Sequence, residues 1–485
     1  MKLNKIMLTA GLAALIALQT SCRENEYGEV DLTMPDDETP SYEPIEAQYT
    51  YNHPCAMWSQ NDFDEVKNLL EGSAPVEVQE AYQQLCNSRF ASASYQPSPT
   101  EWIVRGDDTG TYIDDGDPDK HTENYGNAMR DAAAAYQLAL RWKLSGDDQY
   151  AATAVNILNQ WAATCKGITS NDANQVLAAG AQGYTFANAA EILRSYTGWN
   201  ESDFTVFCDW MVDVFASKNK DFLDTHTGNN VCALHYWSNW DLVNMCSYLA
   251  IGILTENDEM VNYVVNYFYQ GAGNGCINNL IQGTFTDPLG TGEQICQNQE
   301  SGRDQGHAEM STMVAANLAQ MAYTLYSQGN NTVTQLDFFA AGDNALLKMG
   351  EYVALCNLKD GQDNANNDGA WLVTVEQMPF NRYEYCVDCS CRDKNHSEVH
   401  EGPCFVKINE KTGRDESGRG GVRPGWEIYL NHYKRVKGLS SGFAYVKQFA
   451  DKLRPECGAG DSRYGTNSGA FDQLGWGTLM LYRGE

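Results

Sequence analysis

Helical segments follow one another along most of this chain, and that succession limits the folds it can form. Apolar residues recur at the three- and four-residue spacing of a helix face in successive segments, which are 62–70, 128–144, 149–165, 173–196, 203–217, 240–254, 260–269, 307–326, 341–358, 426–436 and 443–453. Turn signals such as Gly-Asp-Asp and Glu-Asn-Asp separate them, and alternating strand patterns are scarce. The sequence therefore predicts an all-α fold, with any β-structure confined to the C-terminal third.

Three architectures consist of repeated helical hairpins: a bundle, an open solenoid and a closed α/α toroid. No fixed sequence period is present, which disfavours a repeat solenoid. Long irregular connections at 97–126, 271–306 and 359–424 are typical of one rim of a toroid. We therefore expect an α/α toroid, an incomplete or closed barrel of helical hairpins with long rim loops, over residues 51–485.

The first residues predict a targeting signal rather than a part of the fold. Two lysines precede an apolar run over residues 6–18, which is too short to span a bilayer as a mature helix. The run ends in Leu-Gln-Thr-Ser-Cys, which resembles a bacterial lipoprotein cleavage box with Cys22 as the lipidated residue and Gln19 in place of the usual leucine. An ordinary secretory signal is the alternative. The sequence thus predicts a lipoprotein signal peptide over residues 1–22.

Residues 23–50 are acidic, interrupted by prolines and poor in apolar side chains, so they predict a flexible tether between the lipid and the folded domain. We expect a secreted outer-membrane lipoprotein, at the cell surface or in the periplasm, that contacts the membrane only through its lipid anchor.

The charge balance excludes several partners. The chain has 64 acidic and 33 basic side chains, a formal net charge of −31. Nucleic acids and anionic lipid headgroups require a basic surface, so neither is an expected partner. A polyanion can bind only where a local group of Arg, His and Asn side chains overrides this negative field.

The 15 cysteines do not indicate a catalytic metal. Several lie inside apolar helical runs, where we expect free buried thiols, namely Cys165, Cys208, Cys246 and Cys356. A separate cluster comprises Cys386, Cys389, Cys391, His396, His400 and Cys404. Its position outside the cytoplasm favours disulfides or free thiols in a rim loop, with a structural zinc site as the alternative. No cofactor is expected.

One polar motif follows Asn229-Asn230 and leads into a helix: His235-Tyr236-Trp237-Ser238-Asn239-Trp240-Asp241-Leu242. In the functional interpretation, Asn239 is a neutral donor to an anionic group in a cleft lined by Trp237 and Trp240. The alternative is a plain helix N-cap at Asn239.

A second motif, Glu300-Ser301-Gly302-Arg303-Asp304-Gln305-Gly306-His307, also opens a helix. Its glycines let the backbone approach a ligand, and a helix N-terminus beside Arg303 and His307 suits a carboxylate. A loop held by a salt bridge between Arg303 and Asp304 is the alternative. The nearby Gly271-x-Gly273-x-Gly275 follows no strand pattern and does not predict a nucleotide site.

A third group combines arginines with tyrosines. Arg382 lies near Tyr383 and Tyr385, and Arg423 precedes Tyr429 and Tyr433. Most of these tyrosines are expected to be core aromatics.

These motifs resemble those of alginate-lyase-type polysaccharide lyases, and are most similar to polysaccharide lyase family 38, which acts on alginate, mannuronan or glucuronan. The resemblance rests on the run 131–142, on Ser238-Asn239-Trp240-Asp241-Leu242, on the octapeptide 300–307 and on Arg423-Pro424-x-Trp426-Glu427 with Asn431-His432-Tyr433. It covers about residues 125–480, with the motifs in the family's order.

The resemblance implies an α/α toroid that cleaves a 4-linked uronate polymer by β-elimination without a metal. It implies Asn239 as the residue that neutralises the carboxylate, His307 as the active-site histidine and Arg303 beside it. For the catalytic tyrosine and second arginine we favour Tyr385 with Arg382 over Tyr429 or Tyr433 with Arg423. The expected substrate contacts are His235, Trp237, Trp240, Gln305, Arg423 and Tyr433. Some relatives carry a histidine directly after the asparagine, where this chain has Trp240, and that difference shifts the base role to His307 or a tyrosine.

Two other functions remain open from sequence. A glycoside hydrolase on the same fold would need two opposed carboxylates, such as Asp114 or Asp115 with Asp304. A glycan-binding lipoprotein without activity would stack sugars on Trp237 and Trp240. The product distinguishes them: a lyase leaves an unsaturated end, a hydrolase leaves a hydrated reducing end, and a binding protein leaves the polymer intact.

Overall fold

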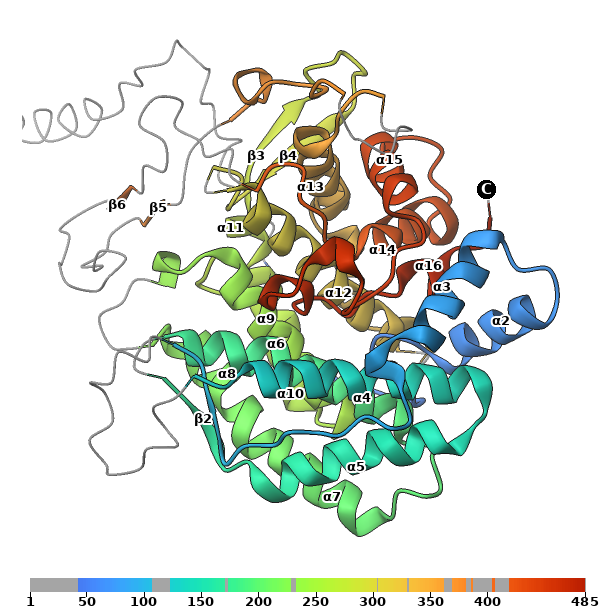
Figure 1. Ribbon diagram of the computed structural model, residues 1–485. Helices are drawn as coiled ribbons and strands as arrows, with labels where there is room; N and C mark the ends of the chain where they lie inside the picture. The colour runs from blue at the N-terminus through green and yellow to red at the C-terminus, as the bar shows by residue number, and fades with distance from the viewer. Residues whose placement is uncertain are drawn as a thin grey trace, which may run out of the picture. The chain divides into compact units, whose positions relative to one another are not determined.

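The computed structural model describes residues 42–106, 123–170, 173–227, 233–302, 304–328, 331–361, 369–380, 385–386, 404–405 and 418–484, with the backbone alone at 385–386 and 404–405 (Figure 1). The chain divides into a unit Met1–Glu43 and a compact unit Pro44–Glu485. The fold described below is that of the second unit.

Helices dominate the compact unit. Their bounds are α2 (Gln60–Glu71), α3 (Val76–Asn87), α4 (Gly126–Ser145), α5 (Asp148–Thr164), α6 (Asn174–Leu193), α7 (Glu201–Trp210), α8 (Ser217–Thr225), α9 (Ser238–Leu254), α10 (Asp258–Gln270), α11 (Ile277–Leu280), α12 (Gln305–Gln328), α13 (Ala341–Asn357), α14 (Trp426–Leu430), α15 (Ala444–Leu453) and α16 (Gly477–Leu481). No helix in the described part of the chain is both long and apolar enough to cross a bilayer.

The helices close into a ring. In the order α2, α4, α6, α9, α12, α14 and α16, each helix contacts the next, and α16 returns to contact α2. Helices α5, α8, α10, α13 and α15 pack against members of this ring (Figure 1). This two-layered closed arrangement is an α/α toroid and confirms the predicted fold class.

Helices α6 and α9 pack closely against each other. Nearly every residue of both helices is buried, as expected for helices covered on all sides. A Cβ atom at Gly180 would lie 2.6 Å from Val243 Cγ2, so the glycine lets the two backbones approach closely.

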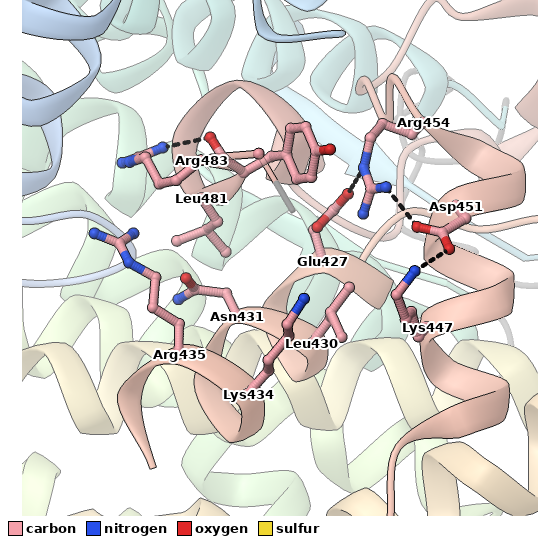
Figure 2. A pocket seen from close by; sticks show the side chains of 12 residues that line it. Glu427, Leu430, Asn431, Lys434, Arg435, Lys447, Asp451, Arg454, Leu481 and Arg483 are labelled. Atoms are coloured by element: carbon pink, nitrogen blue, oxygen red, sulfur yellow. Dashed lines mark hydrogen bonds and ion pairs between the residues drawn. The ribbon is translucent and has the colours of Figure 1, made fainter. Parts of the chain in front are cut away.

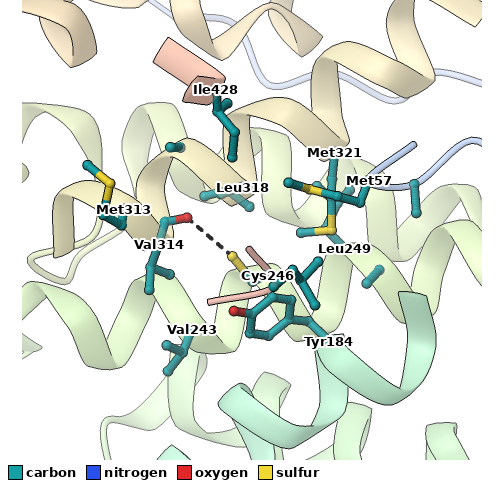
Figure 3. Packing of buried hydrophobic residues seen from close by; sticks show 14 of the residues in the cluster. Met57, Tyr184, Val243, Cys246, Leu249, Met313, Val314, Leu318, Met321 and Ile428 are labelled. Atoms are coloured by element: carbon teal, nitrogen blue, oxygen red, sulfur yellow. Dashed lines mark hydrogen bonds between the residues drawn. The ribbon is translucent and has the colours of Figure 1, made fainter. Parts of the chain in front are cut away.

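In part of the core, aliphatic, methionine and cysteine side chains pack together with the ring of Tyr184 (Figure 3). Cys246 on α9 donates its thiol to the carbonyl of Val314 on α12, with 3.6 Å between sulfur and oxygen. Cys165 and Cys246 are free and buried, as predicted, Cys356 is buried, and Cys208 is free and half-buried. These thiols act as small core side chains.

Short strands connect the helices at several places. Strand β1 (Trp102–Val104) pairs in parallel with β2 (Gly167–Thr169), and β3 (Ile281–Thr286) forms an antiparallel pair with β4 (Gln294–Asn298). Strands β5 (Tyr385–Cys386) and β6 (Cys404–Phe405) are antiparallel, with Cys386 opposite Cys404 in the backbone register. The expectation that β-structure is confined to the C-terminal third is therefore wrong. The connections pair locally with one another to satisfy their backbone groups.

Several features differ from the predictions. The first helix is capped by Ser59 in a capping box with Asp62, rather than by Asp62 itself. Helix α3 was not predicted. Part of the predicted tether 23–50 packs on the domain: the backbone amides of Ile45 and Ala47 donate to the Asn266 and Asn262 side chains of α10, at 2.8 Å and 3.1 Å.

Candidate active site

The two helices that open after the polar motifs, α9 and α12, begin next to each other. Ser238 at the start of α9 and Ser311 in the second turn of α12 are in hydrogen-bond contact, with 3.0 Å between their Oγ atoms. Ser311 lies four residues after His307, on the same face of α12, so the start of α9 lies about one helical turn from His307. Two motifs that are far apart in sequence thus meet.

A buried carboxylate joins these helix starts. Glu300 is fully buried, and its Oε1 accepts hydrogen bonds from the Asn239 amide Nδ2 at 2.6 Å, the Asn239 backbone N–H at 3.0 Å and the Ser311 hydroxyl at 2.6 Å. The Ser238 hydroxyl donates to the same oxygen at 3.2 Å. Glu300 therefore fixes the geometry of this corner.

Asn239 differs from the expectation in two respects. The N-cap of α9 is Trp237, so Asn239 is not a plain cap. Its side chain is only 2% exposed and donates to Glu300, so it does not face a cleft as a free donor to a substrate carboxylate. In this structure Asn239 is a positioning residue.

His307 is the exposed titratable group of the corner. Its side chain is 40% exposed, and Nδ1 lies 2.6 Å from Asp304 Oδ2. The other carboxylate oxygen of Asp304 accepts the His307 backbone N–H at 2.8 Å. Among the described residues, none forms a hydrogen bond with Nε2 of His307. Asp304 thus orients the ring and leaves Nε2 available for chemistry, as in dyads in which a carboxylate holds a catalytic imidazole.

A strap of residues 418–423 crosses the start of α12. Gly418 lies against Gly306, and the Gly420 backbone N–H donates to Asn357 Oδ1 at 2.9 Å. Asn357 in turn donates to Gln305 Oε1 at 3.1 Å. Gln305, expected to contact substrate, is 4% exposed and instead holds the strap to α12.

Arg423 ends the strap and is also a structural residue. Its guanidinium donates to the Gly306 and Gly469 carbonyls and to the Asp472 carboxylate, at 3.1, 3.0 and 3.0 Å. Its backbone N–H donates to buried Glu309 at 3.0 Å. Arg423 therefore joins α12 to the loop before α16 at the rim, and its side chain is 15% exposed.

The aromatic residues of the first motif lie at the start of α9 and just before it. Trp237 is half-buried, and Trp240 is half-buried against Tyr236, with their ring centroids 4.9 Å apart. His235, in the short helix η4 (Ala233–His235), is half-buried and makes an edge contact with Tyr236. Strand β5, which contains Tyr385, lies next to η4.

Tyr433 and Tyr429 are core residues. Both are fully buried, and their hydroxyls donate to the Phe339 and Thr312 carbonyls at 2.8 Å. Burial raises the pKa of both tyrosines above the ordinary range, which keeps them protonated. The expectation that Tyr433 contacts substrate, or that either supplies the proton transfer, is corrected by their place in the core.

Several predicted residues lie outside the described residues: Asp114, Asp115, Asn229, Asn230, Arg303, Arg382 and Tyr383, and all of the cysteine cluster except the backbone of Cys386 and Cys404. Tyr385 is described by its backbone only. The same holds for the predicted signal peptide with Cys22 and for most of the tether.

A second buried network below α9 was not predicted. His226 Nε2 lies 2.9 Å from Asp241 Oδ1, and the Tyr267 hydroxyl donates to the same oxygen at 3.3 Å. The Gly275 backbone N–H donates to Asp241 Oδ2 at 2.7 Å, and a Cβ at Gly275 would lie 2.4 Å from the Asp241 Cβ. The repeated glycines of 271–275 were thus a signal of close packing around Asp241.

A pocket of about 240 Å³ opens elsewhere, between α14, α15 and α16 (Figure 2). Arg454 in its wall is paired with Glu427, with 2.6 Å between Nε and Oε1, and also with Asp451. None of the residues predicted for catalysis or substrate binding lines it. Its lining consists of Glu427, Leu430, Asn431, Lys434, Arg435, Lys447, Asp451, Arg454, Leu481, Tyr482, Arg483 and Gly484.

Comparison with known proteins supports the α/α-toroid fold. Residues 52–285 match the family model described as Alginate lyase. Alginate lyase A1-III from Sphingomonas species A1 is similar with a TM-score of 0.51 and 12% identity, covering 90% of this chain and 98% of that chain. A histidine-to-alanine variant of alginate lyase A1-III, complexed with a tetrasaccharide, also has a TM-score of 0.51 and 12% identity, covering 90% and 97%. No curated protein matches the sequence.

Proposed function

We propose that the chain is a polysaccharide lyase of the alginate-lyase type, and that it cleaves a 4-linked uronate polymer, mannuronan or glucuronan, by β-elimination at the corner where α9 and α12 begin. The match of residues 52–285 to the Alginate lyase family model and the similarity in fold to alginate lyase A1-III support this proposal. The observation that carries this proposal is the half-exposed pair of His307 and Asp304, with Nδ1 held and Nε2 available.

The reaction needs a base at C5 of the uronate. His307 Nε2 takes the C5 proton, the electron pair forms the C4–C5 double bond, and the C4–O4 bond breaks. Asp304 stabilises the imidazolium that forms, because its carboxylate lies 2.6 Å from Nδ1. A proton must then reach O4 of the leaving sugar.

The acid that protonates O4 depends on the sugar. In mannuronate and glucuronate the C5 proton and O4 lie on the same face, so one group can serve both steps. In guluronate they lie on opposite faces, and a second group is required. In this proposal His307 is the shared group, and Tyr385 is our candidate for the second group, because β5 lies beside η4 on the same corner. An arginine nearby would lower the tyrosine pKa from about 10.

In this proposal, cationic side chains neutralise the substrate carboxylate. Arg303 and Arg382 are the candidates, since the Asn239 amide is bound to Glu300. Preorganised donors at the carboxylate stabilise the enediolate that develops in the transition state. Trp237 and His235 border the same corner and are candidates for sugar contacts.

We also propose that Cys22 carries the lipid that holds the enzyme at the outer membrane, with the acidic segment as a tether. This would place the domain where extracellular or periplasmic polymer is available.

The test is a screen of the purified protein against mannuronan, guluronan, glucuronan and glycosaminoglycans. We expect new unsaturated, ultraviolet-absorbing ends on mannuronan or glucuronan, without added metal. A new reducing end that lacks this absorbance would instead indicate hydrolysis, and binding without cleavage would indicate a glycan-binding protein.

A further inference from the structure

A second cluster of reactive side chains lies where the N-terminal segment of the domain meets α6. His53 Nδ1 lies 2.6 Å from Glu191 Oε1 and 3.7 Å from Cys55 Sγ. One ligand atom from each of these three residues lies within 4.8 Å of the others. Imidazole, thiolate and carboxylate are the ligands from which tetrahedral zinc sites are built.

The burial of the cluster suits a bound ion. Cys55 is fully buried, and the Glu191 and His53 side chains are 2% and 14% exposed. Glu191 Oε1 accepts the Cys55 backbone N–H at 2.8 Å as well as facing His53. Its other oxygen, Oε2, is buried and has no hydrogen-bond partner. A buried carboxylate oxygen without a partner is costly, and a cation beside it removes that cost.

The remaining nitrogen of His53 is held as in known metal sites. Nε2 lies 3.2 Å from Glu256 Oε1, and Arg194 forms an ion pair with the same carboxylate. Histidines that bind a metal through one nitrogen commonly donate the other to a carboxylate, which fixes the tautomer and leaves the ligating nitrogen unprotonated. Here that arrangement directs Nδ1 toward Cys55 and Glu191.

We propose that His53, Cys55 and Glu191 bind one structural Zn²⁺ ion, with water as the fourth ligand. Binding of the ion displaces the proton between His53 Nδ1 and Glu191 and the proton of the Cys55 thiol, and both protons are released to solvent. The ion lies far along the sequence from the His307 corner and takes no part in elimination. Its role is to fasten residues 53–55 to α6, a ring helix of the toroid.

The test begins with the protein expressed without its predicted signal peptide. The protein is loaded with zinc sulfate or with cobalt chloride, and its metal content is then measured. We expect about one zinc per chain, and in the cobalt form a thiolate-to-cobalt charge-transfer band in the near ultraviolet. Cys55→Ala should lose the band and the metal. Cys86→Ala, which removes a free, half-buried thiol on α3, should keep both.

Two further variants keep the test decisive if Cys55→Ala folds poorly. His53→Gln, at the solvent side of the cluster, should also lose the metal, and Glu256→Gln should weaken zinc affinity by roughly 10- to 100-fold. Absence of the cobalt band in the parent would overturn the proposal. So would a band that survives Cys55→Ala and disappears in Cys389→Ala, because the metal would then lie in the cysteine cluster.

Discussion

Two acidic residues of the octapeptide 300–307 divide the work at the candidate site. Asp304 is half-buried and orients the His307 ring, while Glu300 is fully buried and accepts hydrogen bonds from Asn239, Ser238 and Ser311. An exposed carboxylate can stabilise a transient imidazolium, and a buried one is suited to holding a fixed geometry. The hydrogen bonds of Glu300 thus fix the helix starts beside the reacting histidine.

The Asn239 amide is predicted to be a stability determinant. Asn239→Ala removes the donor 2.6 Å from Glu300 Oε1 and leaves a buried carboxylate less well satisfied, which should lower the free energy of unfolding by about 1–3 kcal/mol. Denaturant unfolding measures this. The control is Asn61→Ala on the exposed face of α2, which should change stability by less than about 0.5 kcal/mol. Equal stability of the two variants would show that the Glu300 cluster does not hold the corner.

At the residue scale, the motifs that form the corner could be predicted from the sequence, but the role of each of their residues could not. The helix starts at 238 and 305 follow from local polar and glycine signals, so His307 could be predicted as a candidate. The bond between Asn239 and Glu300 spans 61 positions and depends on tertiary packing. For the same reason, Tyr433 could not be distinguished from an exposed tyrosine without knowing that Phe339 packs against it.

At the scale of elements, the approach of α6 to α9 is the closest packing in the ring and gives a second prediction. Gly180→Ala places a Cβ 2.6 Å from Val243 Cγ2 and 2.9 Å from the Val243 backbone carbon, so the helices must separate. We expect a loss of about 1–3 kcal/mol of unfolding free energy. The exposed Gln160→Ala on α5 is the control and should be nearly neutral. A stabilised Gly180→Ala variant would contradict the packing described.

Individual helices were predictable because their amphipathic spacing is local, and most were found within a few residues. The closure of the ring was not predictable in the same way. It depends on α2 and α16 lying side by side, although they are at opposite ends of the domain, and on short helices such as α14 and α16 whose apolar runs are brief. The β1–β2 pair likewise joins two connections that neither segment's pattern specifies.

At the scale of the whole molecule, buried acids predict how stability depends on pH. Burial raises the pKa of Glu309 to about 8 and that of Glu351 and Glu456 to about 7. The unfolded chain releases these protons near about pH 4.3, so between that pH and about 8 the folded state binds more protons. Stability should therefore fall as pH rises through this window.

Buried His432 affects stability at the acidic end of the pH range. Burial lowers its pKa to about 3, so it stays neutral in the fold while an unfolded histidine becomes charged below about pH 6.5. The stability that the neutral His432 contributes to the folded state is therefore lost as the pH falls below about 6.5. Thermal unfolding should give a higher Tm at about pH 6 than at about pH 8.5, and Glu309→Gln should reduce that difference. A Tm that rises between these two pH values would contradict the assignment.

The role of His307 is tested by the rate at which His307→Ala forms unsaturated ends on the uronan that the parent cleaves fastest. If His307 moves a proton in the transition state, turnover should fall by about 10²-fold or more, and Asp304→Asn should fall by a smaller factor. Both variants should keep the parent's Tm within a few degrees, because the His307 side chain is 40% exposed and asparagine keeps the size and an acceptor oxygen of Asp304. Near-normal elimination by His307→Ala on every uronan that the parent cleaves would contradict the account and move the base to another residue.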